Sequence, residues 1–64
     1  MYRTFIRTWW KANPNWPNGL EPKAGRRHYV GNYQTEVEAR AACHKWNSEN
    51  KPGKYSRKME FEEV

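Results

Sequence analysis

The sequence predicts an α+β domain in which one helix packs on one face of a small three-stranded antiparallel sheet, in the order strand, strand, helix, strand. Two observations predict this class. Three segments are rich in aromatic and β-branched residues or alternate between apolar and charged residues, which is typical of strands. One segment has a helix-capping pattern followed by small residues. The 64 residues are enough for a single domain, 1–64, with a thin core.

The first strand is expected in "YRTFIRTWWK", residues 2–11, because aromatic and β-branched residues favour extended chain. Residues 12–25 contain three of the four prolines and two of the four glycines, which excludes a helix or a central strand there. We therefore expect a long loop rich in Pro and Asn between strands one and two. "RRHYVGNY", residues 26–33, is expected to form the second strand, with Gly31 at a bulge or bend.

The helix is the clearest local signal, because Thr35 and Glu38 fit the capping box that satisfies backbone N–H groups at a helix start. A helix is therefore expected from about Glu36. An advance of 100° per residue brings four residues onto one stripe: Ala39, Ala42, Cys43 and Trp46. Since three of them are small, the helix is expected to lie close to the sheet. Residues 47–53 end the helix, and the alternating residues 54–64 are expected to form the third strand.

Alternation gives the first strand two faces. One face holds Tyr2, Thr4, Ile6, Thr8 and Trp10, and the other holds Arg3, Phe5, Arg7, Trp9 and Lys11. Burying three unpaired cations costs more than exposing two rings, so the second set is expected to face solvent, away from the helix. Phe5 and Trp9 are thus expected to point outward beside their basic neighbours.

The net charge of +5 is unevenly distributed along the chain. The first 31 residues contain six basic residues and one glutamate, whereas the remainder contains six basic residues and six glutamates. Any attraction to a polyanion is therefore expected from the first half. An exposed strand of alternating cations and rings, beside a strand with Arg26 and Arg27, is typical of a surface where cations neutralise phosphates and rings stack on bases.

The predicted function is therefore a small non-catalytic nucleic-acid-binding module that uses a basic and aromatic sheet face, with DNA favoured over RNA. The predicted contacts are Arg3, Phe5, Arg7, Trp9, Lys11, Arg26 and Arg27. Two alternatives stay open for this face. Glu60 and Glu62 are expected on the same face if the third strand pairs with the first, where they would pair with the arginines and cancel the patch. Phe5 or Trp9 would otherwise cover a second small core beneath the long loop, with arginine stems over the rings.

The alternative function is a protein-interaction module that binds and modulates a host protein through exposed tryptophans. The predicted contacts are then Trp9 and Trp16. Trp16 lies between Pro14 and Pro17, so a stiff loop would present it at low entropic cost. The other interpretation of Trp16 is a ring folded back to close the loop.

One segment resembles known DNA-binding domains. "RRHYVGNYQTEVEARAA", within residues 26–46, resembles the strand-turn-helix of the plant ethylene-response-factor domain and of the arm-binding domain of phage tyrosine integrases. The shared features are an aromatic strand followed by Gly31, Tyr33, Thr35, Ala39 and Ala42. Those families place a three-stranded sheet in the DNA major groove, and the resemblance implies Arg7, Trp9, Arg26 and Arg27 as contacts.

The resemblance has limits that the sequence itself shows. Both families place three consecutive strands before the helix, whereas here one strand is expected after it. The segment "NPNWPNGLEP" also has no counterpart in them. Taken whole, the chain resembles small bacteriophage-encoded proteins, which implies a genetic setting rather than an activity.

Enzyme chemistry is not expected. The chain has no Asp, and neither His28 nor His44 has an evident nucleophile or oriented carboxylate beside it. Cys43 and His44 are adjacent and point to different helix faces, so with His28 they cannot complete a four-ligand zinc site. No metal and no cofactor are therefore expected.

A single cysteine excludes an internal disulfide, and no apolar run has the length of a membrane span or of a signal-peptide core. A cytoplasmic location is expected, in the host cell if the chain is phage-encoded, with no membrane partner. The initial Met1 and the lack of a tag or repeat are typical of a complete small open reading frame. Monomer and homodimer both stay open, because a three-stranded sheet has two edges that can pair.

Overall fold

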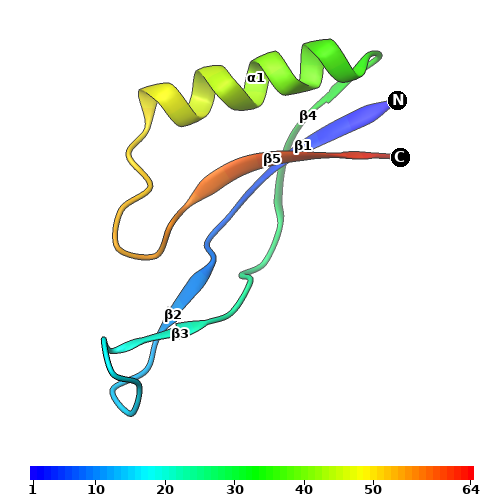
Figure 1. Ribbon diagram of the computed structural model, residues 1–64. Coiled ribbons are helices and arrows are strands. Elements are labelled where there is room, and N and C mark those ends of the chain that lie inside the picture. The colour runs from blue at the N-terminus through cyan, green and yellow to red at the C-terminus, as the bar shows by residue number, and fades with distance from the viewer.

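A computed structural model describes all 64 residues and contains one helix and five strands (Figure 1). The elements in chain order are β1 (Tyr2–Arg7), β2 (Trp10–Ala12), β3 (Leu20–Pro22), β4 (His28–Tyr33), α1 (Glu36–Glu49) and β5 (Lys58–Glu63). The α+β class is confirmed, and so is a three-stranded antiparallel sheet, which has the order β4-β1-β5. The expected strand order is wrong in detail, because β2 and β3 form a second, two-stranded sheet.

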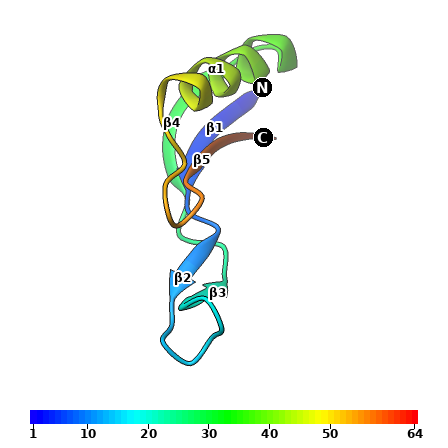
Figure 2. The ribbon, with the colours of Figure 1, turned by 60° about the vertical axis from the view of Figure 1, so that its left-hand side comes forward.

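The helix lies on one side of the three-stranded sheet, and the β2–β3 ribbon extends away from both (Figure 2). The molecule is therefore elongated, with extents of 43 × 23 × 13 Å. The two chain ends lie side by side at the opposite end from the ribbon (Figure 1), where the Val64 N–H donates to the Met1 carbonyl at 2.9 Å. No helix in the structure is both long and apolar enough to span a lipid bilayer.

The expected first strand divides at Thr8 and Trp9, where the chain bends out of the main sheet. Across the bend, the N–H of Gly25 donates to the Thr8 carbonyl at 2.7 Å and that of Lys23 to the Trp9 carbonyl at 3.0 Å. β1–β2 and β3–β4 are thus the two sides of one long, bent hairpin. The expectation of a long loop over residues 12–25 is wrong in part, because Leu20–Pro22 form β3, whereas no helix and no central strand forms there, as expected. Prolines in this region lack the N–H groups that a wider sheet would need.

The pairing of β1 with β4 contains the irregularity expected at Gly31. Thr4 pairs with Gly31 whereas Phe5 pairs with Tyr29, so the register shifts by one residue and Val30 has no partner across the strand pair. A bulge of this kind bends a strand and increases its local twist. The expectation of a bulge or bend at this position is therefore confirmed.

The helix begins where the capping pattern predicts. The Thr35 hydroxyl accepts a hydrogen bond from the Glu38 N–H at 3.2 Å, and Thr35 has the extended backbone of an N-cap. Ala39 and Cys43 are buried against the sheet, with 0% and 7% of their surface exposed, and Ala42 is half-buried beside them. The predicted small-residue stripe is therefore the packing face of α1.

The core is thin, as expected from the chain length. Only five of the 64 residues are buried: Thr4, Phe5, Ala39, Cys43 and Met59. Four of them lie between α1 and the sheet or within the strands it covers, whereas Phe5 alternates with Thr4 and lies on the opposite sheet face. The face away from the helix therefore has a small buried cluster of its own.

Candidate functional site

The sheet face opposite α1, here called the open face, gathers side chains from β1, β5 and the start of β4. Its members are Arg3, Phe5, Arg7, Trp9, Arg27, Tyr29, Glu60 and Glu62. The expected outward orientation of Arg3, Phe5 and Arg7 away from the helix is therefore confirmed.

The arginines of the open face are paired with glutamates. Arg7 contacts Glu60 at 3.1 Å, because β1 and β5 are antiparallel neighbours in the sheet. Glu62 accepts from two arginines, from Arg3 at 3.1 Å and from Arg27 at 2.6 Å. The alternative in which the two glutamates pair with the arginines is thus confirmed. Because two carboxylates are paired with three guanidinium groups, the open face keeps a small excess of positive charge.

Phe5 is not available as a stacking surface. Only 3% of its surface is exposed, so the expectation that it faces solvent is wrong. The guanidinium carbons of Arg7 and Arg27 lie 5.3 and 4.9 Å from its ring centre, and the Tyr29 ring contacts it in a T-shaped arrangement at 5.8 Å. The physical reason is that the arginines, held by their glutamate partners, cover the ring. The second small core therefore exists, but these side chains form it rather than the loop.

Trp9 is also engaged within the protein. Its indole N–H donates to Glu60 Oε1 at 2.7 Å, and the Arg7 guanidinium lies 4.2 Å from its ring centre. Its ring is half-buried. Both the polar edge and one face of Trp9 are therefore occupied by neighbours on the open face.

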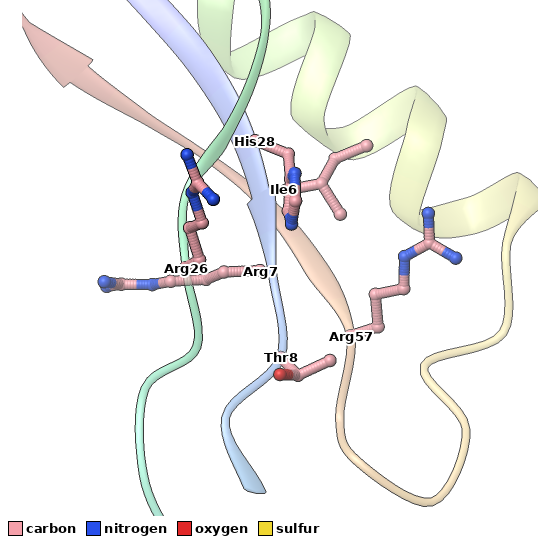
Figure 3. Close-up of a pocket in the computed structure, with 6 residues that line it drawn as sticks. All are labelled: Ile6, Arg7, Thr8, Arg26, His28 and Arg57. Atoms are coloured by element: carbon pink, nitrogen blue, oxygen red, sulfur yellow. The ribbon is translucent and has the colours of Figure 1, made fainter. Parts of the chain in front are cut away.

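A concave surface lies on the other side of the sheet, where the segment after α1 approaches the bend of the hairpin. A first cavity of about 410 Å³ is lined by Ile6, Arg7, Thr8, Arg26, His28 and Arg57 (Figure 3). Ile6 and Thr8 alternate with Arg7 along the strand and so lie on the α1 side. Figure 3 shows the Arg7 guanidinium directed away from Ile6 and Arg57.

A second cavity of about 360 Å³ adjoins the first and shares Thr8 and Arg26 with it. Its other lining residues include two exposed rings and two lysines: Trp10, Tyr55, Lys11 and Lys23. We call the two cavities together the basic cleft.

The basic cleft has positive charge without acidic neighbours in its lining. Four of its cations form no ion pair: Lys11, Lys23, Arg26 and Arg57. Glu21 lies opposite Lys11 in the β2–β3 ribbon, but it accepts from Asn13 at 3.3 Å and does not line the cleft. Several unpaired cations around one concave surface focus a positive potential there, so the cleft is suited to bind anions.

The structure divides the seven predicted nucleic-acid contacts between two faces. Lys11 and Arg26 line the basic cleft, whereas Arg3, Phe5, Trp9 and Arg27 belong to the open face. Arg7 touches the cleft but pairs with Glu60 on the open face. Trp16, the other predicted interaction residue, lies at the tip of the ribbon with 43% of its surface exposed.

Sequence reasoning missed the other basic and aromatic residues of the cleft: Trp10, Lys23, His28, Tyr55 and Arg57. One signal could have indicated the site. Once Glu60 and Glu62 are assigned to the arginines of the outward face, the cations left without a carboxylate are those on the other face and after the helix. Trp10 also belongs by alternation to the helix side of the first strand.

Two further features bear on the chemistry of these surfaces. Hydrogen bonding to Tyr29, together with the charge of Glu62, raises the pKa of Arg27 above its usual range, so this guanidinium stays charged on the open face. No group of three or more His, Cys, Asp or Glu side chains that could hold a metal ion is present.

No protein-family model, curated protein or solved structure matches the chain. The resemblance of residues 26–46 to the two DNA-binding families therefore stays a prediction. The structure does place β5 after α1, as expected, whereas those families have all three strands before the helix.

Proposed function

We propose that the protein is a small non-catalytic nucleic-acid-binding module whose binding surface is the basic cleft. The proposed phosphate contacts are the four unpaired cations of the cleft: Lys11, Lys23, Arg26 and Arg57. The proposed binding surface therefore differs from the one that the sequence indicates, which is the open face. The resemblance of residues 26–46 to DNA-binding domains favours DNA over RNA, although those domains bind duplex DNA through the sheet and not through a cleft of this kind.

The observation that supports the proposal is the separation of paired from unpaired cations. On the open face, Arg3, Arg7 and Arg27 each have a carboxylate partner. A phosphate that bound there would have to compete with Glu60 and Glu62. In the cleft no such competition exists, so each cation is free to release counterions when it neutralises a phosphate.

Two neighbouring arginines provide a matched test. Arg26 lies in the cleft without an ion pair, whereas Arg27 is bound to Glu62 at 2.6 Å on the open face. Arg26→Gln and Arg27→Gln remove the same charge from adjacent positions. The measurement is the affinity for a fluorescein-labelled oligonucleotide, followed by anisotropy over a range of salt concentrations.

Arg26→Gln is expected to weaken binding and to reduce the slope of log K against log salt by about 1, since one phosphate contact is lost. Arg27→Gln is expected to leave that slope unchanged. Equal losses for both variants would contradict the assignment to the cleft. No binding of DNA or RNA by the wild-type protein at low salt would refute the proposed function as a whole.

A second candidate function is protein interaction through Trp16, which one observation favours. The ribbon tip that holds Trp16 is fixed by backbone hydrogen bonds: Trp16 donates to the Asn13 carbonyl at 3.1 Å, and Gly19 donates to the Trp16 carbonyl at 2.9 Å. A preorganised, exposed tryptophan is a typical interface anchor. In affinity capture from host lysate, a partner retained by the wild type and by Arg26→Gln but lost with Trp16→Ala would support this function.

A further inference from the structure

The second cavity of the basic cleft contains two rings that face open space. Trp10 and Tyr55 have 38% and 37% of their surface exposed, and neither takes part in an aromatic pair within the protein. Trp9, the neighbour of Trp10, is half-buried, and Glu60 and Arg7 occupy its edge and face. Lys54 Nζ lies over the Tyr55 ring, 5.7 Å from its centre, so the Trp10 ring and the remaining surface of the Tyr55 ring are the aromatic surface still available beside the unpaired cations.

Backbone hydrogen bonds join the two chain segments that carry these rings. The N–H groups of Trp9 and Trp10 both donate to the Tyr55 carbonyl, at 2.9 and 3.2 Å. The opposite side of the bend is fixed by the bonds from Lys23 to Trp9 and from Gly25 to Thr8. Three chain segments are thus joined by backbone hydrogen bonds beside the cavity. A preformed site does not have to order its walls on binding.

Charged groups line both this cavity and the first one. Lys11, Lys23 and Arg26 line it together with the rings, and Arg26 is shared with the first cavity, which Arg57 and His28 also line. The cleft thus has both rings and three cations in its second cavity, and Arg57 in the first cavity beside it. A strand of nucleic acid has the matching arrangement, since each base is linked to a phosphate and the phosphates repeat along the backbone.

We infer that the basic cleft binds single-stranded rather than duplex nucleic acid, with an unpaired base against Trp10 and Tyr55 and the adjoining phosphates on Arg26 and Arg57. This inference rests on the proposed function and specifies its ligand. In a duplex the base faces are already stacked on one another, so the rings would have nothing to contact except at an end. In a single strand the faces are free to stack on aromatic side chains.

The test compares ligands that differ in one property at a time. A labelled single strand is displaced by five unlabelled competitors at the same salt concentration: the DNA strand, the RNA strand, the DNA strand with abasic sites, the duplex and a mononucleotide. The abasic strand keeps the phosphates and lacks the bases, so it isolates the contribution of stacking. Either the DNA or the RNA strand qualifies as the ligand, because both have bases and phosphates.

If one base stacks in the cleft, the intact strand is expected to bind about tenfold more tightly than the abasic strand or the duplex. Trp10→Ala is expected to remove this difference, weakening the intact strand about tenfold while the abasic strand and the duplex bind as before. Trp10→Phe, which keeps a ring, is expected to retain most of the affinity. Trp16→Ala, an exposed tryptophan outside the cleft, is the control and is expected to change nothing.

The outcomes separate the inference from the function on which it rests. Equal affinity for the intact strand, the abasic strand and the duplex would overturn the single-strand inference and leave a nucleic-acid-binding module. A mononucleotide that competes as well as the strand would also overturn it. Binding of none of the five ligands would overturn the proposed function itself. Should Trp10→Ala unfold the protein, the comparison of intact and abasic strands with the wild type still decides the inference.

Discussion

The Trp9 indole N–H donates to Glu60 Oε1 at 2.7 Å, and this contact joins β5 to the bend between the two sheets. The other oxygen of the same carboxylate binds Arg7 at 3.1 Å, and the Arg7 guanidinium in turn lies over the Trp9 ring. One carboxylate thus orders a cation and a ring that would otherwise be free to bind ligands. The open face is therefore better described as part of the stabilising structure.

Removal of the Glu60 carboxylate is expected to destabilise the fold. Glu60→Ala leaves the Arg7 side chain, which is 15% exposed, without its partner, and we expect a loss of about 2–3 kcal/mol in the free energy of unfolding. Glu60→Gln keeps an oxygen for the Trp9 N–H, so a smaller loss of about 1 kcal/mol is expected. Urea denaturation followed by tryptophan fluorescence measures both. Glu49→Ala, at an exposed glutamate, is the control. An equal loss in the free energy of unfolding for Glu49→Ala and Glu60→Ala would contradict the structural role of Glu60.

The bend of the hairpin requires glycine at position 25. A Cβ there would lie 2.6 Å from the Thr8 hydroxyl and 3.3 Å from the Thr8 carbonyl oxygen. Gly25→Ala is therefore expected to cost about 1–3 kcal/mol in thermal or urea denaturation. Gly31→Ala is the matched control, because its Cβ would make only ordinary contacts, the nearest at 3.6 Å.

The clash predicts a specific rescue. Because the shortest contact is to the Thr8 hydroxyl, Gly25→Ala is expected to cost less in a Thr8→Ala background than in the wild type. Strictly additive effects of the two substitutions would show that this close approach does not determine the geometry of the bend.

The helix and the open face could largely be predicted because their signals are local or follow from strand alternation. The Thr35 cap and the Ala39 stripe depend on spacing within one turn of helix. The pairing of Glu60 with Arg7 follows from side-chain alternation once the third strand is placed beside the first. The sequence leaves the burial of Phe5 open between two alternatives, since it depends on how the arginine side chains pack.

The bend and the basic cleft could not be predicted, because each depends on contacts between distant segments. Nothing near Thr8 in the sequence indicates that the strand ends there; the chain bends where Tyr55 accepts two hydrogen bonds from it. Arg57 and Arg26 are far apart in sequence and meet only after α1 has packed on the sheet. The sequence alone therefore indicates a basic first half and a neutral second half rather than one site formed by both.

Asn47 is expected to be the main polar attachment of α1 to the sheet. Its side chain bonds the backbone of Met59 twice, donating to the carbonyl at 3.1 Å and accepting from the N–H at 2.9 Å. Asn47→Ala would leave both groups of this edge strand without these partners, so a loss of about 1–3 kcal/mol is expected on urea denaturation. Asn47→Asp keeps the acceptor alone and should lie between. Ser48→Ala, the exposed neighbour, is the control, and an equal effect there would argue against the attachment.

The alkaline limit of stability is expected to depend on Cys43. Burial, with a smaller contribution from the charge of Glu60, raises the pKa of its thiol above the ordinary 9.0. Above this ordinary value the unfolded chain binds fewer protons than the folded one, so the free energy of unfolding falls as pH rises toward the folded-state pKa.

Cys43→Ala is expected to flatten this fall between about pH 8.5 and 10. Ionisation of Tyr2, whose pKa the charge of Glu63 raises above 10.0, remains at higher pH in both proteins. Urea denaturation at a series of pH values measures the slope, and identical slopes for the two proteins below pH 10 would contradict the role of the thiol.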